Sequence, residues 1–120
     1  LPKEIPLKDA VTQWANVGGL ISGLYTDNYN LISNSLVDII VEPARKPLIP
    51  LFDDVKNSAL KAGALGAGIS GSGPTIFALC KGDAIANSVY KSIEKSYKNK
   101  GITFEMFISK VNPEGMKIIK

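Results

Sequence analysis

Residues 64–80 read Ala-Leu-Gly-Ala-Gly-Ile-Ser-Gly-Ser-Gly-Pro-Thr-Ile-Phe-Ala-Leu-Cys: an apolar run, a segment rich in glycine and serine over residues 70–75, and a second apolar run. Short apolar runs on both sides of such a loop are typical of two paired strands, so the stretch predicts a hairpin. The spacing G-x-G-x-x-G over residues 66–71 also occurs in dinucleotide-binding folds, where it opens a helix. Here Pro74 and the β-favouring Thr75-Ile76-Phe77 follow it, which excludes that interpretation.

The loop of this hairpin contains more glycine than a turn requires. Gly68, Gly71 and Gly73 have no Cβ atom, and Ser70 and Ser72 stand beside them. The backbone N–H groups of such a loop are uncovered, so an anion or a second loop can approach them closely. The residues alone leave two interpretations open, a hairpin turn with no other role and a backbone cradle for an anion.

Apolar residues recur at steps of three and four before the hairpin, which predicts amphipathic helices. The first helix has a stripe that we expect to face the core, formed by Leu7, Val11, Trp14, Gly18, Ile21 and Tyr25. The second helix is capped by Asp27 or Asn28 and ends before Pro43, with a stripe of Ile32, Leu36 and Ile39. The third helix opens at Asp53 and Asp54 and closes at Lys61, with Gly63 as its C-cap.

After the hairpin, residues 84–100 form a fourth predicted helix with a stripe of Ile85, Val89, Ile93 and Tyr97. Phe104, Met106 and Ile108 then alternate with other residues, which predicts a half-buried strand. Between the second and third helices, residues 42–47 contain two prolines and are expected to run extended or turned.

Composition excludes several classes of protein. The 120 residues are 45% apolar and 21% charged, and we expect residues 1–120 to form a single globular domain. The chain has no histidine, which excludes a His-dependent acid/base mechanism and argues against a zinc site. The single cysteine, Cys80, excludes an intramolecular disulfide and is interpreted as a small buried hydrophobe at a strand end.

Charge and hydropathy limit the classes of partner that the chain can have. The net charge is +3, and the basic residues are scattered except for four lysines on the fourth helix, which are typical of a solvated face. We therefore expect no nucleic-acid partner. No apolar run approaches the length of a membrane span, and the first residues have no apolar signal core, so we expect a cytoplasmic protein without a membrane partner.

Two motifs at a matched separation resemble a known family. Residues 42–50 read Glu-Pro-Ala-Arg-Lys-Pro-Leu-Ile-Pro, and residues 68–79 read Gly-Ile-Ser-Gly-Ser-Gly-Pro-Thr-Ile-Phe-Ala-Leu. Together they resemble the C-terminal domain of the homoserine kinases, a branch of the GHMP small-molecule kinases, over essentially the whole chain. The resemblance implies a ferredoxin-like α+β fold, with an antiparallel sheet packed on helices and preceded by two extra helices.

The resemblance also implies an activity, the ATP-dependent phosphorylation of the side-chain hydroxyl of L-homoserine on the route to threonine. In that family ATP and Mg²⁺ are bound mainly by an N-terminal domain, whose glycine-rich phosphate loop has no counterpart in this sequence. We therefore expect a fragment that works with its own N-terminal kinase domain and is inactive alone. No catalytic residue and no metal ligand is assigned to these 120 residues.

Four residues are implied as site residues by the resemblance. Arg45 is placed near the substrate, where a planar guanidinium can hold the α-carboxylate of homoserine through two parallel charge-assisted bonds. The chain uses lysine thirteen times and arginine once, which fits a position where geometry matters more than charge. Gly71, Ser72 and Gly73 are expected to pack beside the phosphate loop of the N-terminal domain and help to shape the cleft.

Two alternatives belong to other functional classes. One is a free-standing ferredoxin-like module that binds an amino acid and regulates another protein, and the other is a structural remnant without a ligand. A homo-oligomer is a further expectation. The resemblance places one more strand before Leu1, and a neighbouring strand left without it would have an unpaired edge that can add a strand from a second copy.

Overall fold

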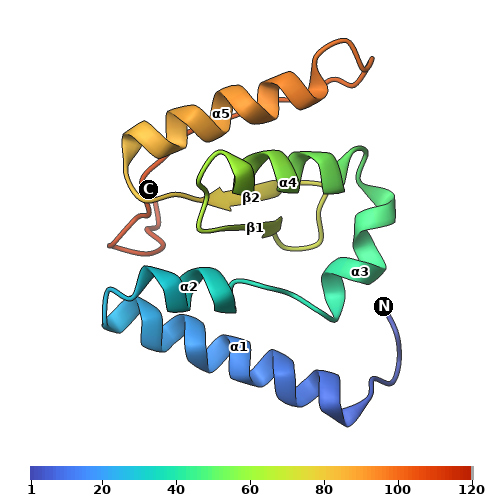
Figure 1. The fold of residues 1–120 in the computed structure, drawn as a ribbon, viewed down its shortest axis with the longest axis vertical. Coiled ribbons are helices and arrows are strands. Elements are labelled where there is room, and N and C mark those ends of the chain that lie inside the picture. The colour runs from blue at the N-terminus through green and yellow to red at the C-terminus, as the bar shows by residue number, and fades with distance from the viewer. Residues whose placement is uncertain (120) are drawn as a thin grey trace.

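The computed structural model describes residues 1–119 and shows five α-helices, one short 3-10 helix and two strands (Figure 1). In chain order the elements are α1 (Leu7–Tyr25), α2 (Tyr29–Ser35), α3 (Val41–Arg45), η1 (Lys46–Leu48), α4 (Phe52–Lys61), β1 (Gly66–Ile69), β2 (Ile76–Leu79) and α5 (Asp83–Tyr97). The predicted α+β class is confirmed, and the sheet in the described residues has two antiparallel strands.

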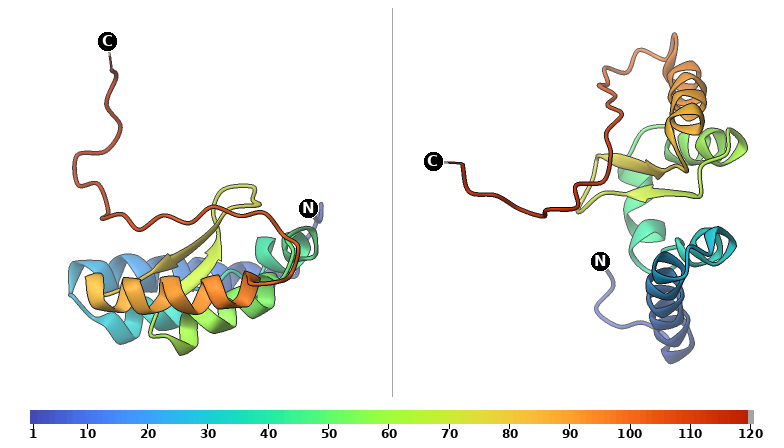
Figure 2. Two further views of the ribbon diagram at one scale, coloured as in Figure 1. Left: turned by 90° about the horizontal axis from the view of Figure 1, so that it is seen from above. Right: turned by 90° about the vertical axis from the view of Figure 1, so that its left-hand side faces the viewer.

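The helices α1, α2, α4 and α5 lie side by side in one layer, and the β1–β2 hairpin lies on one side of that layer (Figures 1 and 2). α1 packs with α2, and α4 packs with α5 and with β1. In the hairpin Gly66 lies opposite Leu79 and Ile69 lies opposite Ile76. The predicted hairpin is therefore confirmed, with residues 70–75 as its loop, and the G-x-G-x-x-G spacing begins on a strand rather than at the start of a helix.

The core cluster between α4, the hairpin and α5 consists of small residues. Ala59 of α4, Ala64, Ala67 of β1 and Val89 of α5 form one buried cluster. Small side chains let the two helices and the hairpin approach closely, because they add little bulk between the backbones. α4 has Asp53 and Asp54 in its first turn and Lys61 in its last turn, as predicted, but its C-cap is Ala62, and the predicted cap Gly63 follows one residue later at φ 103°.

α1 has the predicted bounds, but the prediction of its buried face is wrong. Trp14 is 65% exposed, and the rest of its stripe is also at the surface. The face that packs on α2 is instead made of small residues: a Cβ at Gly19 would lie 2.3 Å from Ser35 Oγ, and one at Gly23 would lie 2.9 Å from the Ile32 backbone nitrogen. The missing side chains allow a close contact between the helix backbones, so the bulky residues are left on the opposite side.

The segment between α2 and α4 is helical where an extended or turned backbone was expected. α2 ends at Ser35, before Ile39, and α3 and η1 cover residues 41–48. Pro43 is the third residue of α3. A proline is tolerated in the first turn of a helix because the N–H groups there have no acceptor within the helix.

The predicted strand through Phe104, Met106 and Ile108 is not formed in the described residues, where α5 ends at Tyr97 and residues 102–110 have no ladder partner. This tail runs away from the helical layer on the side of the hairpin (Figure 2). Phe104 stacks on Tyr97 with 4.6 Å between the ring centroids. A strand needs a neighbour for its N–H and C=O groups, and no described segment pairs with the tail. None of the described helices is long and apolar enough to cross a membrane.

Candidate functional site

The short helix α3 and the hairpin loop meet at one hydrogen bond. Arg45, the last residue of α3, donates from Nη1 to the backbone oxygen of Ser72 in the loop, at 2.7 Å. Arg45 is half-buried and Ser72 is exposed. The structure therefore brings together two of the site residues selected from the sequence, although they are 27 positions apart.

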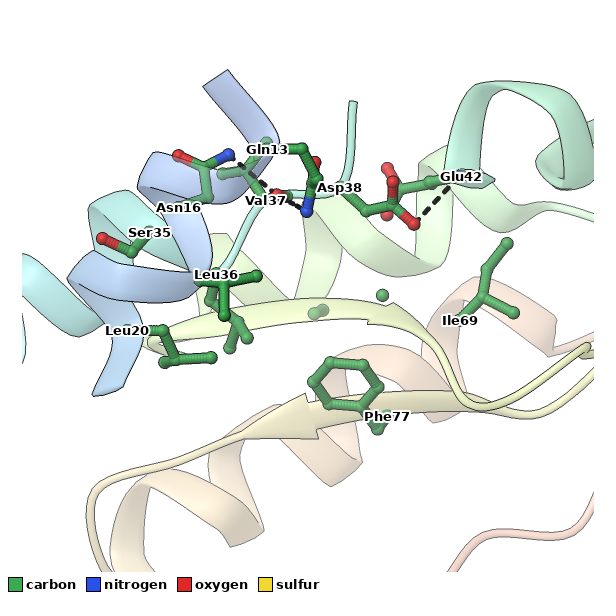
Figure 3. Close-up of a pocket in the computed structure, with 13 residues that line it drawn as sticks. Gln13, Asn16, Leu20, Ser35, Leu36, Val37, Asp38, Glu42, Ile69 and Phe77 are labelled. Carbon is green, nitrogen blue, oxygen red and sulfur yellow. Dashed lines mark hydrogen bonds between the residues drawn. The ribbon is translucent and has the colours of Figure 1, made fainter. Parts of the chain in front are cut away.

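The start of α3 is fixed by a side chain that sequence reasoning missed. The carboxylate of Asp38 accepts hydrogen bonds from the backbone N–H groups of Ile40, Val41 and Glu42, at 2.9, 2.8 and 3.2 Å. Figure 3 shows Asp38 beside Glu42. A helix of five residues has too few internal bonds to be stable alone, so this cap contributes much of what holds it. The signal in the sequence is an aspartate three residues before the helix.

Two ion pairs connect the α3–η1 segment to α4. Lys56 Nζ lies 2.5 Å from Glu42 Oε1, and the two side chains are only 18% and 13% exposed. Lys46 Nζ lies 3.0 Å from Asp53, but those side chains are 39% and 64% exposed. Solvent weakens an exposed pair, so the inner pair does more to set the position of α3.

The two glycines of the loop differ in their surroundings. The loop is closed by a hydrogen bond from Ser70 N–H to the Thr75 oxygen at 2.8 Å. Gly71 has φ 59°, and a Cβ there would meet no atom within 4 Å. Gly73 has φ 80°, and a Cβ there would lie 3.2 Å from Ile49 Cδ1 and 3.3 Å from Ile69 Cγ2. The backbone at Gly71 is therefore open to an approaching group, whereas Gly73 packs closely against Ile49 and Ile69.

A cavity of about 140 Å³ lies between α1, the segment after α2 and the hairpin (Figure 3). Two amide side chains of α1 border it and hold the neighbouring segment: Gln13 Oε1 accepts from Ile39 N–H at 3.1 Å, and Asn16 Nδ2 donates to the Val37 oxygen at 3.0 Å. Neither Arg45 nor Ser72 lines this cavity. The amides are engaged with backbone, so their role here is to connect α1 to the segment that leads into α3.

Cys80 does not have the character of a nucleophile. It is half-buried beside the core cluster, and burial raises the pKa of its thiol. A raised pKa keeps the thiol protonated near neutral pH, and only the thiolate is strongly nucleophilic. This agrees with its interpretation as a small hydrophobe at the end of β2.

Comparison with known proteins places the chain in a family. The family described as GHMP kinases C terminal matches residues 19–99. Homoserine kinase of Chlorobium phaeovibrioides is 46% identical over 121 residues, which cover 99% of this chain and 38% of that relative. Homoserine kinase of Chlorobium phaeobacteroides strain BS1 is 48% identical with the same coverage.

A solved structure gives the same result. The crystal structure of homoserine kinase from Cytophaga hutchinsonii has a TM-score of 0.83 and 52% sequence identity, over 86% of this chain and 33% of that one. The chain thus spans little more than a third of the length of the curated relatives, at 38%. The matches confirm the family predicted from the two motifs, and the chain belongs to the GHMP kinase family, where it corresponds to the C-terminal domain of the homoserine kinases.

Proposed function

We propose that this chain is the substrate-side domain of an ATP-dependent homoserine kinase, which phosphorylates the side-chain hydroxyl of L-homoserine in the cytoplasm on the route to threonine. The observation that carries the proposal is the convergence of Arg45 and the hairpin loop, joined by the 2.7 Å bond from Arg45 Nη1 to Ser72. The names of the relatives support the choice of homoserine among the substrates of GHMP kinases.

In this proposal Arg45 binds the α-carboxylate of the substrate. The bond to Ser72 uses one of the five N–H donors of the guanidinium and fixes its plane. The remaining donors can hold a carboxylate through two parallel bonds, which lysine cannot reproduce. A carboxylate held in this way leaves the hydroxyl at the other end of homoserine free to point toward the phosphate donor.

The loop contributes its backbone to the other half of the site. ATP and Mg²⁺ are bound mainly by the N-terminal kinase domain in this proposal, and residues 71–73 lie beside its phosphate loop. The open backbone at Gly71 supports this, because no side chain of the described residues lies where a Cβ would be. Phosphoryl transfer depends on positioning and on stabilising charge, so exposed N–H groups near the phosphates are useful without side-chain chemistry.

An assay of the full-length protein that contains this domain tests the proposal. Release of ADP from Mg-ATP is measured with L-homoserine, galactose and mevalonate, each in the same concentration series. We expect turnover with L-homoserine at a kcat/KM at least a hundredfold above that for the other two alcohols. Equal or greater turnover with another alcohol would contradict the substrate, and no ADP release with any of them would favour a regulatory module or a structural remnant.

A further inference from the structure

The carboxylate of Glu42 connects its own helix to two other elements of the fold. It is on α3, it pairs with Lys56 of α4 at 2.5 Å, and its Oε2 lies 3.4 Å from where a Cβ on Gly68 of β1 would be. This is an ordinary van der Waals distance, so the carboxylate packs beside the strand that leads into the hairpin loop. Figure 3 shows Glu42 at the edge of the cavity, next to the aspartate that caps α3.

Glu42 and Arg45 lie three positions apart on the same five-residue helix. The contact of Glu42 with Lys56 fixes how α3 is rotated about its axis and how closely it packs on α4. Both affect where the guanidinium of Arg45 lies. The pair is largely shielded from water, so its attraction is screened less than that of the exposed pair between Lys46 and Asp53. Glu42 thus has the connections needed to align Arg45 without contacting the substrate.

We infer that Glu42 is a positioning residue, which acts with Lys56 to hold Arg45 against the loop oxygen of Ser72 in the geometry that binds the substrate carboxylate. This inference rests on the proposed function, because it assigns to Arg45 the role given there. Glu42 itself does not touch homoserine or ATP. Its loss weakens substrate binding and leaves the chemical step in place.

Kinetics of the full-length kinase containing this domain test the inference through Glu42→Gln. This variant keeps the shape of the side chain and removes its charge. We expect the KM for homoserine to rise about tenfold, with kcat and the KM for ATP within twofold of the parent, since the substitution misaligns a binding group only. The matched control is Asp53→Asn, which breaks the exposed pair between Lys46 of η1 and α4 and should leave both KM values within twofold.

A double-mutant cycle separates positioning from a general loss of stability. If Glu42 acts through Arg45, then Glu42→Gln adds less than a twofold effect once Arg45 is already lysine. The reversed pair, Glu42→Lys with Lys56→Glu, restores an ion pair between the two positions. Its log KM for homoserine should therefore lie at least halfway back from the value of Glu42→Gln to that of the parent. A tenfold effect of Glu42→Gln that persists in the Arg45→Lys background, or a fall in kcat with an unchanged KM, would overturn the inference.

A measurement without substrate distinguishes failure of this inference from failure of the proposed function. The ¹⁵N–¹H signals of the Arg45 guanidinium in the 120-residue chain report its bond to Ser72. We expect Glu42→Gln to shift and broaden them, and Asp53→Asn to leave them unchanged. If Glu42→Gln shifts them while Arg45→Lys leaves the homoserine KM unchanged, the positioning stands and the substrate role of Arg45 fails. Unchanged signals in Glu42→Gln overturn the positioning.

Discussion

Replacement of Gly71 by alanine tests whether another group occupies the open space beside the hairpin loop in the complete enzyme. Gly71 has φ 59°, in the left-handed region, and its surroundings leave room for a methyl group. The substitution therefore adds a Cβ that meets nothing within the described residues. Any group that approaches this backbone from the N-terminal domain or from ATP would meet that methyl.

The expected cost in stability is small and can be worked out from the backbone. A left-handed conformation costs an alanine about 1–2 kcal/mol. Alanine also restricts the unfolded chain, which stabilises the folded state by about 0.4–1 kcal/mol. The net loss in the free energy of unfolding is therefore about 1 kcal/mol. That corresponds to a fall in Tm of about 3–6 °C for a domain of this size.

Gly101→Ala is the matched control for this experiment. Gly101 has φ 69° and also has nothing within 4 Å of a Cβ, but it lies just beyond α5, in the tail. The two variants should lose the same stability. Gly73 is unsuitable, because a Cβ there would press on Ile49 and Ile69 and a loss of activity would follow from poor folding.

Activity is measured in the full-length kinase and Tm in the 120-residue chain. We expect Gly71→Ala to lower kcat at least tenfold. Loss of one donor from an oxyanion site lowers kcat about a hundredfold or more, and the added methyl group displaces the backbone N–H donor without removing it, so the effect is smaller. Gly101→Ala should keep kcat within twofold. If both variants lose activity in proportion to their stability, the loop is a hairpin turn and its proposed place beside the phosphates is refuted.

Three further outcomes are expected. Arg45→Lys in the full-length enzyme should raise the homoserine KM at least tenfold, since a bidentate charged contact contributes about 1.5–3 kcal/mol, and leave the KM for ATP unchanged; an unchanged homoserine KM in steady-state assays would make Arg45 a surface residue. The 120-residue chain alone should bind Mg-ATP more weakly than millimolar in isothermal titration, because the phosphate loop is assigned to the other domain; micromolar binding would contradict that assignment. The same chain should self-associate in sedimentation velocity over a hundredfold range of concentration, because β2 has a free edge and apolar side chains such as Trp14 and Phe107 are exposed; a single monomeric species throughout would show that these surfaces do not pair.

Local signals in the sequence were enough for α4, the hairpin and α5. In α4 the acidic first turn, the lysine in the last turn and the glycine just beyond the helix all indicate the same helix. In the hairpin the glycine-rich loop separates two apolar runs that pair with each other. Agreement between several local preferences is what makes such elements predictable.

The remaining features depend on contacts between distant residues. The apolar stripe of α1 was assigned to the core because periodicity counts bulky residues, whereas α2 packs on the glycines. α3 is held by contacts of the Asp38 and Glu42 side chains. A search for helical periodicity does not take such contacts into account. The tail was predicted as a strand from alternation alone, although a strand also needs a neighbour to pair with.

The candidate site shows the same division. Arg45 and residues 71–73 were each selected through the family resemblance, but neither motif indicates that the arginine bonds to the loop. That contact depends on where α3 sits relative to β1, and this position is set by Glu42, Lys56 and Asp38 together. Side-chain contacts across 14 residues of sequence, such as the one between Glu42 and Lys56, are outside the reach of local patterns.

The most direct test of the central claim, that Arg45 holds the substrate carboxylate, compares two substrates in two enzymes. L-Homoserine and 3-aminopropan-1-ol, which lacks the carboxylate, are assayed with the parent full-length kinase and with Arg45→Ala. We expect the variant to lower kcat/KM for homoserine about ten- to a hundredfold and to leave kcat/KM for the amino alcohol within twofold. Arg45→Ala also loses the bond to Ser72, and this loss affects both substrates equally. The ratio of the two kcat/KM values therefore reports the carboxylate contact alone. An equal loss with both substrates would contradict the claim.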